Sequence, residues 1–91
     1  MSVRHDPEQQ RFIGVVPGGE AELVYSYFAD TVLNIEHTAV PPGARGQGIS
    51  DALIRAALAY ARDRGFAVMA TCPFAQQWLA AHPDERPVPA R

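Results

Sequence analysis

The sequence predicts a mixed α/β (α+β) fold in which an antiparallel β-meander precedes a helix, a parallel strand and a short C-terminal helix. Three observations indicate this order: strand-like alternation broken by turn residues before residue 41, helical spacing from residue 49, and an apolar run at residues 66–71. At 91 residues the chain is expected to form a single domain over residues 1–91, because one core still stabilises a fold of this size without disulfides.

Turn residues divide the first part of the chain into short strand patterns. We expect strands at residues 3–6, 11–16, 22–29 and 32–40. The Pro17-Gly18-Gly19 segment favours a hairpin between the second and third of these strands. Because each connection is short, the four strands should pair as an antiparallel meander.

The spacing changes to that of a helix after the glycine-rich loop. Apolar and small residues recur at offsets of three and four over residues 49–64: Ile49, Leu53, Ala56, Ala57, Tyr60 and Arg64. Gly65 follows as a C-cap. The apolar run FAVMAT at residues 66–71 suits a strand covered on both faces. A strand, helix, strand crossover makes this strand parallel to the one before the helix, so their carboxyl ends should lie together.

A second helix is expected over residues 73–81, burying Phe74, Trp78 and Leu79. The proline-containing end, residues 82–91, is expected to fray. Tyr25 and Tyr27 on the third strand are interpreted as packing residues rather than ligand platforms, and Trp78 is interpreted in the same way.

Composition excludes several classes of function. A net charge of -2 without a basic cluster argues against binding to nucleic acid. No apolar run approaches the ~20 residues of a membrane-spanning helix, and the first residues, MSVRHDPEQQ, lack the apolar core of a signal peptide. We therefore expect no membrane association and a cytoplasmic protein. Cys72 is the single cysteine, and the spacing of His5, His37 and His82 is not typical of zinc ligands, so no metal is expected.

The loop within residues 38–53, TAVPPGARGQGISDAL, has the features of an anion site. Glycines at a strand-to-helix turn let backbone amides approach a pyrophosphate, and the helix start adds positive charge. A Walker loop is excluded because Ile49 stands where the phosphate-binding lysine belongs. A Rossmann loop is excluded because Asp51 replaces the third glycine, the preceding strands are antiparallel, and no acidic residue follows the next strand.

The segment Arg45-Gly46-Gln47-Gly48-Ile49-Ser50 resembles the acetyl-CoA loop Q/R-x-x-G-x-G/A of the GNAT acyltransferase superfamily, from which Ser50 departs by one hydroxyl. The H-T-x-V-P-P segment at residues 37–42 and the C-P-F segment at residues 72–74 extend the resemblance over nearly the whole chain. In particular, the chain is similar to the small, minimal GNAT-like N-acetyltransferases. The resemblance therefore implies a GNAT-like fold.

The same resemblance implies acetyl-CoA as co-substrate, with the pyrophosphate on the loop amides and the pantetheine arm between the two parallel strands. The residues expected to bind it are Val40, Arg45, Gly46, Gln47, Gly48, Ile49, Ser50, Pro73 and Phe74. Arg45 is the natural phosphate partner, although a solvated loop arginine is the alternative. Larger superfamily members cover the acceptor with additional N-terminal helices, for which this chain has no room. The acceptor amine, a small molecule or a protein lysine, is thus unidentified, and a monomer or weak homodimer is expected.

Cys72 and His37 are the candidate catalytic residues. A lone cysteine is most often a small buried apolar residue. Cys72, however, stands before the last helix with Pro73 at the first helical position, and a helix N-terminus favours thiolate. The resemblance implies that Cys72 takes up the acetyl group or lies beside it. Either Cys72 is acetylated and passes the group to the amine, or the amine attacks acetyl-CoA directly while amides near Val40 polarise the carbonyl.

His37 can act as a general base near neutral pH. Its alternation with Leu33 and Ile35 predicts instead an inward face and a hydrogen-bonded core histidine, with Glu36 and Thr38 as solvated residues on the other face. Both interpretations stay open. At the level of function, an N-acetyltransferase competes with a non-catalytic CoA-binding or protein-interaction module.

Overall fold

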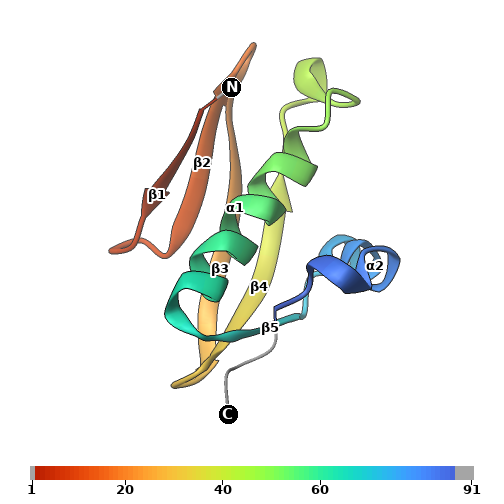
Figure 1. The fold of residues 1–91 in the computed structure, drawn as a ribbon. Coiled ribbons are helices and arrows are strands. Elements are labelled where there is room, and N and C mark those ends of the chain that lie inside the picture. The colour runs from red at the N-terminus through yellow and green to blue at the C-terminus, as the bar shows by residue number, and fades with distance from the viewer. Residues whose placement is uncertain (1, 88–91) are drawn as a thin grey trace.

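The computed structural model describes residues 2–87, over which it has a five-stranded sheet and two α-helices (Figure 1). The elements are β1 (Val3–Asp6), β2 (Arg11–Val16), β3 (Gly19–Ala29), β4 (Val32–Ala39), the 3-10 helix η1 (Pro42–Ala44), α1 (Ile49–Arg64), β5 (Ala67–Ala70), α2 (Pro73–Ala81) and the 3-10 helix η2 (Pro83–Glu85). The strands lie in the order β1-β2-β3-β4-β5, antiparallel except for the parallel pair β4 and β5. The predicted meander and the parallel fifth strand are confirmed.

Three strands differ from the sequence prediction, β4 only in that it ends at Ala39 rather than at residue 40. β3 begins at Gly19 rather than at residue 22, because Val16 pairs with Gly19 across a tight turn of Pro17 and Gly18. Gly18 has a φ of 90°, which permits this turn. β5 lies at the edge of the sheet, and only Val68 of its residues is buried, so the expectation of a strand covered on both faces was wrong.

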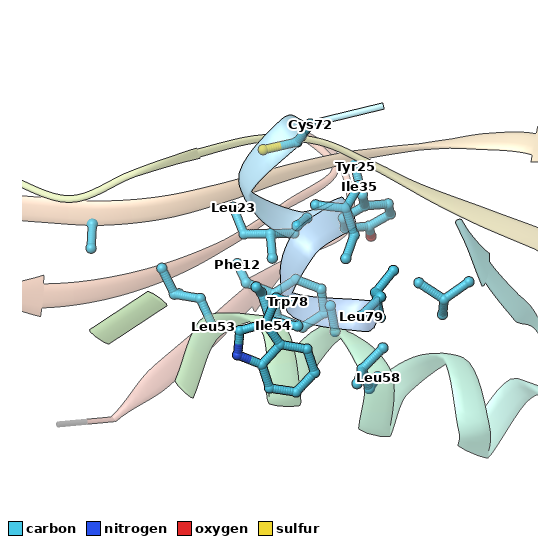
Figure 2. Packing of buried hydrophobic residues seen from close by; sticks show 14 of the residues in the cluster. Phe12, Leu23, Tyr25, Ile35, Leu53, Ile54, Leu58, Cys72, Trp78 and Leu79 are labelled. Carbon is cyan, nitrogen blue, oxygen red and sulfur yellow. The ribbon is translucent and has the colours of Figure 1, made fainter. Parts of the chain in front are cut away.

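Helix α1 packs across one face of the sheet, and the helix predicted over residues 49–64 is confirmed. Of the predicted periodic residues, Ile49, Leu53 and Ala57 are buried, whereas Arg64 is exposed. Its buried residues are Ile49, Leu53, Ile54, Ala57, Leu58 and Ala61. Gly65, with a φ of 73°, ends the helix as predicted, and its amide donates to the carbonyls of Ala61 and Arg62. Helix α2 contributes Trp78 and Leu79 to the same cluster of buried side chains (Figure 2). Neither α-helix in the described part of the chain is long and apolar enough to cross a membrane.

Residues 82–87 are held against α1 and β5, contrary to the expectation that the end of the chain frays. The Arg55 guanidinium donates to both carboxylate oxygens of Glu85, at 2.8 and 3.2 Å. Arg62 donates to the Glu85 carbonyl at 3.1 Å, and Arg86 donates to the Val68 carbonyl at 2.9 Å. These side-chain bonds fix the segment in addition to its own backbone bonds, from Glu85 to the His82 carbonyl and from Arg86 to the Pro83 carbonyl. Residues 88–91 lie outside the described residues.

A β-bulge in β4 decides which side chains face the core. Residues 24 and 25 of β3 pair with His37 and Ile35, so Glu36 has no partner on β3. The extra residue shifts the alternation by one position, and Thr38 rather than His37 shares a face with Ile35. His37 is exposed, as is Glu36. The predicted inward orientation of His37 was therefore wrong, and so was the placement of Thr38 on the solvated face.

The end of the sheet farther from the glycine loop contains a cluster of aromatic rings around His5. The His5 ring stacks on Phe12 at 4.3 Å between ring centroids and meets the edge of Tyr60 at 4.5 Å. Its Nε2 atom shares a hydrogen bond of 2.6 Å with the Tyr25 hydroxyl. Burial lowers the pKa of His5 from its ordinary 6.5, the charge of Arg64 lowers it further, and Asp6 opposes both to a smaller extent.

The pKa of His5 predicts a loss of stability on mild acidification. Because the unfolded chain binds the proton more readily, the free energy of unfolding should fall as the pH drops from about 6.5 through the lower folded-state pKa. Urea denaturation of the wild type and of His5→Gln at pH 7.5 and pH 5.5 measures this effect. The wild type should lose more stability than His5→Gln between these two pH values, and equal losses would contradict the assignment to His5.

Candidate functional site

A cavity of about 720 Å³ lies where the glycine loop leaves β4 and enters α1. Its lining comes from the end of β4, the loop, the first turn of α1 and the start of α2. The lining residues are His37, Thr38, Ala39, Val40, Ala44, Arg45, Gly46, Gly48, Ile49, Ser50, Asp51 and Phe74. This volume is typical of a site for a small-molecule ligand.

The loop reaches α1 through a short 3-10 turn and two glycines in the left-handed region. The amides of Ala44 and Arg45 donate to the carbonyls of residues 41 and 42, at 2.9 and 3.4 Å, and form η1. Gly46 and Gly48 then adopt φ values of 82° and 72°. Residues with a side chain rarely adopt these angles, so the two glycines are what allows the loop to turn its backbone toward the cavity. Arg45 Nε donates to the Val40 carbonyl at 3.3 Å and ties the loop to the end of β4.

The start of α1 presents amides that the protein itself does not use. Within residues 2–87, the amides of Gly46, Gly48, Ile49 and Ser50 donate to no acceptor, and Gly48 is an N-cap without a side-chain cap. The first internal bond of the helix runs from Ala52 to the Gly48 carbonyl at 3.1 Å. Such a helix start combines open donors with the positive end of the helix dipole, which suits an anion.

β4 extends past the end of its pairing with β5. The last pair is Ile35 with Ala70, after which the amides of Thr71 and Cys72 both donate to the Ile35 carbonyl, at 3.1 and 3.2 Å. The chain then turns into α2, while β4 continues to Ala39. The last residues of β4 therefore pair with β3 on one edge and face the cavity with the other.

Asn34 fixes the point at which the two strands separate. Its Oδ1 atom accepts the Thr71 amide at 3.0 Å, and its Nδ2 atom donates to the Thr71 hydroxyl at 3.3 Å. The same Nδ2 atom lies 3.5 Å from the Ser26 hydroxyl on β3. Asn34 is itself buried. These bonds connect β3 and β4 to the residue that follows β5, and they set where the chain departs toward α2.

Cys72 lies behind the cavity wall rather than in it. It is the N-cap of α2, with Pro73 at the first helical position, as predicted. The residue is 7% exposed, belongs to the core cluster, and is absent from the cavity lining. Its Sγ atom lies 3.9 Å from the Oγ1 atom of Thr38, which does line the cavity. The thiol is therefore next to a lining residue without lining the cavity itself.

The chain matches the family described as GCN5-related N-acetyl-transferase over residues 11–88. It belongs to this family. The protein NATD1 of Homo sapiens is 30% identical over 83 residues, which cover 89% of this chain and 74% of that protein. A GCN5-like protein structure from Staphylococcus aureus has a TM-score of 0.71 at 22% identity, covering 92% of this chain and 82% of that chain. An aminoglycoside N-acetyltransferase in complex with CoA has a TM-score of 0.54 at 20% identity, covering 82% and 64%.

The resemblance to minimal GNAT-like N-acetyltransferases and the GNAT-like fold are thus confirmed. Membership of the family indicates acetyl transfer as the class of reaction. In the described ranges no group of three or more His, Cys, Asp and Glu side chains is placed to hold a metal ion.

The structure gathers most of the predicted site residues of this acetyltransferase around one cavity. His37, Val40, Arg45, Gly46, Gly48, Ile49, Ser50 and Phe74 line it, whereas Gln47, Cys72 and Pro73 do not. Phe74 is 46% exposed at the cavity, so the expectation that α2 buries it was wrong. Thr38 and Asp51 also line the cavity and were not predicted as site residues. Asp51 could have been found from its place in the first turn after the loop, but Thr38 could not, because the bulge that turns it has no sequence signature.

The left-handed backbone at the loop glycines predicts the effect of adding a side chain there. An added Cβ at Gly48 would meet no atom within 4 Å, so the left-handed backbone is the only cost of Gly48→Ala, about 1–2 kcal/mol. Gly43→Ala is the matched control, because its Cβ also meets nothing within 4 Å and its φ is not positive. Urea denaturation should show a loss of stability for Gly48→Ala and almost none for Gly43→Ala. Equal effects would show that the positive φ at Gly48 carries no strain.

Proposed function

We propose that this GCN5-related N-acetyltransferase binds acetyl-CoA as a co-substrate in the cavity and transfers its acetyl group to an amine. The observation that carries the proposal is that unused amides at the start of α1 and the unpaired edge of β4 meet in one cavity. The unused amides suit a diphosphate, and the strand edge suits a chain that contains amide groups. CoA contains a diphosphate and an amide-containing arm in one molecule.

The diphosphate would bind mainly through backbone amides. Gly46, Gly48 and Ile49 supply donors at the positive end of α1. Arg45 contributes a guanidinium to the cavity lining. Its Nε atom already donates a hydrogen bond to the Val40 carbonyl, so its two terminal nitrogens are available to donate to phosphate oxygens. Gln47 extends the same loop, although it lies outside the lining.

The pantetheine arm would lie along the open edge of β4. Its amide groups can pair with the backbone of residues 37–39 as an added strand does, since β5 leaves this edge free after Ala70. Phe74 and Pro73, at the start of α2, would border the arm on the other side, where Phe74 is exposed. This course directs the thioester toward Val40 and His37.

The acceptor would approach from the sheet face opposite α1. His37 and Thr38 both line the cavity although they belong to opposite faces of β4, so the cavity reaches around the strand edge. We propose that the amine enters on the His37 side and that His37 accepts its proton as general base. The amine nitrogen attacks the thioester carbonyl carbon, the carbon–sulfur bond breaks, and CoA leaves as the thiolate. The amide near Val40 polarises the carbonyl oxygen.

Direct transfer is favoured over a route through Cys72. In the covalent route, the thiolate would attack the same carbon, release CoA, and yield the acetyl group to the amine in a second step. The burial of Cys72 and the interposed Thr38 side chain oppose this first attack. We therefore assign Cys72 a packing role beside the acetyl group.

A non-catalytic CoA-binding module is the second candidate. One observation favours it: the side chain of His37 forms no hydrogen bond with any of residues 2–87, whereas a catalytic base is usually oriented by a third group. CoA release that depends on an added amine distinguishes the enzyme from the module. An acceptor series of polyamines, amino acids and lysine peptides provides the amines.

Binding of acetyl-CoA is the first prediction of this function. At 100 times its Kd a ligand adds about 2.7 kcal/mol of stability, so the Tm should rise by roughly 10–20 °C. Arg45→Ala should weaken binding by about tenfold in isothermal titration calorimetry, because it removes a charged donor from the diphosphate. Arg4→Ala is the matched control, an exposed arginine of β1 outside the cavity. No Tm shift in the wild type, or equal losses in both variants, would refute the proposed site.

Cys72→Ala separates the two chemical routes. Direct transfer predicts a kcat within about threefold of wild type and no acetylated Cys72 peptide in mass spectrometry of enzyme mixed with acetyl-CoA alone. Cys72→Ser, which keeps a hydroxyl next to Thr38, controls for the volume lost in the alanine variant. An acetylated thiol together with loss of turnover in both variants would establish the covalent route instead.

A further inference from the structure

Trp78 on α2 donates a hydrogen bond to a carboxylate in the wall of the cavity. Its indole Nε1 atom donates to Asp51 Oδ1 at 2.9 Å, and Asp51 is the third residue of α1. Trp78 is 5% exposed, whereas Asp51 lines the cavity beside the unused amides. The bond therefore joins the core to the part of the site where the proposed diphosphate would bind.

An acidic side chain at the third position of a helix ordinarily has another partner. It reaches back to the amide of the N-cap residue, here Gly48, or stays close to the positive helix start. Either placement would occupy or shield the amides that an external anion needs. A carboxylate close to that anion would also repel it. Yet Asp51 accepts from Trp78, and the Gly48 amide stays without an acceptor in the described chain.

The indole is itself held in place by two side chains. His82 stacks on it with 3.9 Å between ring centroids, and the His82 Nδ1 atom lies 2.8 Å from the Trp78 carbonyl. Arg55 places its guanidinium 5.3 Å from the ring centroid and is fixed in turn by Glu85. The ordered segment after α2 thus restrains the orientation of the indole N–H, and through it the orientation of Asp51.

We propose that Trp78 is a positioning residue that holds the Asp51 carboxylate away from the amides at the start of α1, keeping them available for the diphosphate. The inference rests on the proposed function, because it assigns the amides to CoA. Trp78 acts through Asp51 and does not contact the ligand. Its loss should therefore weaken binding only while residue 51 carries a carboxylate.

A double-mutant cycle with CoA as the probe tests this mechanism. Trp78→Phe removes the N–H donor and should raise the Kd of CoA by about tenfold, because the released carboxylate competes for the amides and repels the phosphates. Asp51→Ala should bind CoA at least as well as wild type. The double variant should bind within about threefold of Asp51→Ala, although it lacks the same indole. Leu79→Ala, a buried residue of α2, controls for lost packing.

Asp51→Glu tests the same idea with Trp78 intact. The longer carboxylate can reach the Gly48 amide, as glutamate does in a capping box, so CoA binding should weaken while Asp51→Ala binding does not. Hydrogen exchange at the Gly48 amide, measured by NMR without ligand, should be slower in Asp51→Glu and Trp78→Phe than in wild type. This readout does not depend on CoA, and it keeps the test informative if Trp78→Phe folds poorly.

The outcomes separate the two proposals. A wild type that does not bind CoA refutes the proposed function, whereas slower exchange at Gly48 in the variants would still support the role of Trp78 toward Asp51. A wild type that binds CoA, with equal losses in Trp78→Phe and the double variant, would overturn the inference in favour of a packing role for the indole. Unchanged binding in both Trp78→Phe and Asp51→Glu would overturn it as well.

Discussion

The separation of β4 from β5 after Ile35 is the constraint on which the site depends. The Ile35 carbonyl accepts two consecutive amides, from Thr71 and Cys72, so the chain must leave the sheet at this point. Asn34 binds the same turn through its side-chain amide. β4 then continues without β5, paired with β3 on its other edge, and its free edge becomes one wall of the cavity. Had the two strands paired to their ends, the wall would be closed by β5 and α2 would start elsewhere.

The bulge at Glu36 adds a second consequence to this separation. It turns Thr38 toward the core side, where it meets Cys72, and leaves His37 on the opposite side. Side chains from both faces of β4 thereby line one cavity. In an acyl transfer the acyl donor and the acceptor must reach the same point from different directions. An open strand edge with side chains on both faces allows this with few residues.

Local patterns in the sequence predicted the elements, but they could not predict the contacts made across long separations. Helix α1 was predicted from the three- and four-residue spacing of its side chains, and its end was predicted from Gly65. The loop was predicted from its glycine motif. The predicted orientation of His37 was wrong because one unpaired residue reverses the alternation of side chains along a strand. No residue type indicates such a bulge in the sequence. The predicted burial of Phe74 was wrong because helical spacing does not distinguish a side chain in the core from one in a cavity wall. The order of residues 82–87 depends on Glu85 meeting Arg55, which lies 30 residues earlier.

The start of α1 shows how a binding site conflicts with the stability of its own helix. Helix amides near the N-terminus are most stable when a side chain caps them, and Asp51 has the chemistry to do so. In this structure the N-cap is Gly48, without a side-chain cap, and the carboxylate bonds to α2 instead. Two glycines stand at the same place in the left-handed region, a conformation that residues with a side chain adopt only with strain. Local rules of helix formation are thus broken together over a few residues, which is what a site that reserves its donors for a ligand requires.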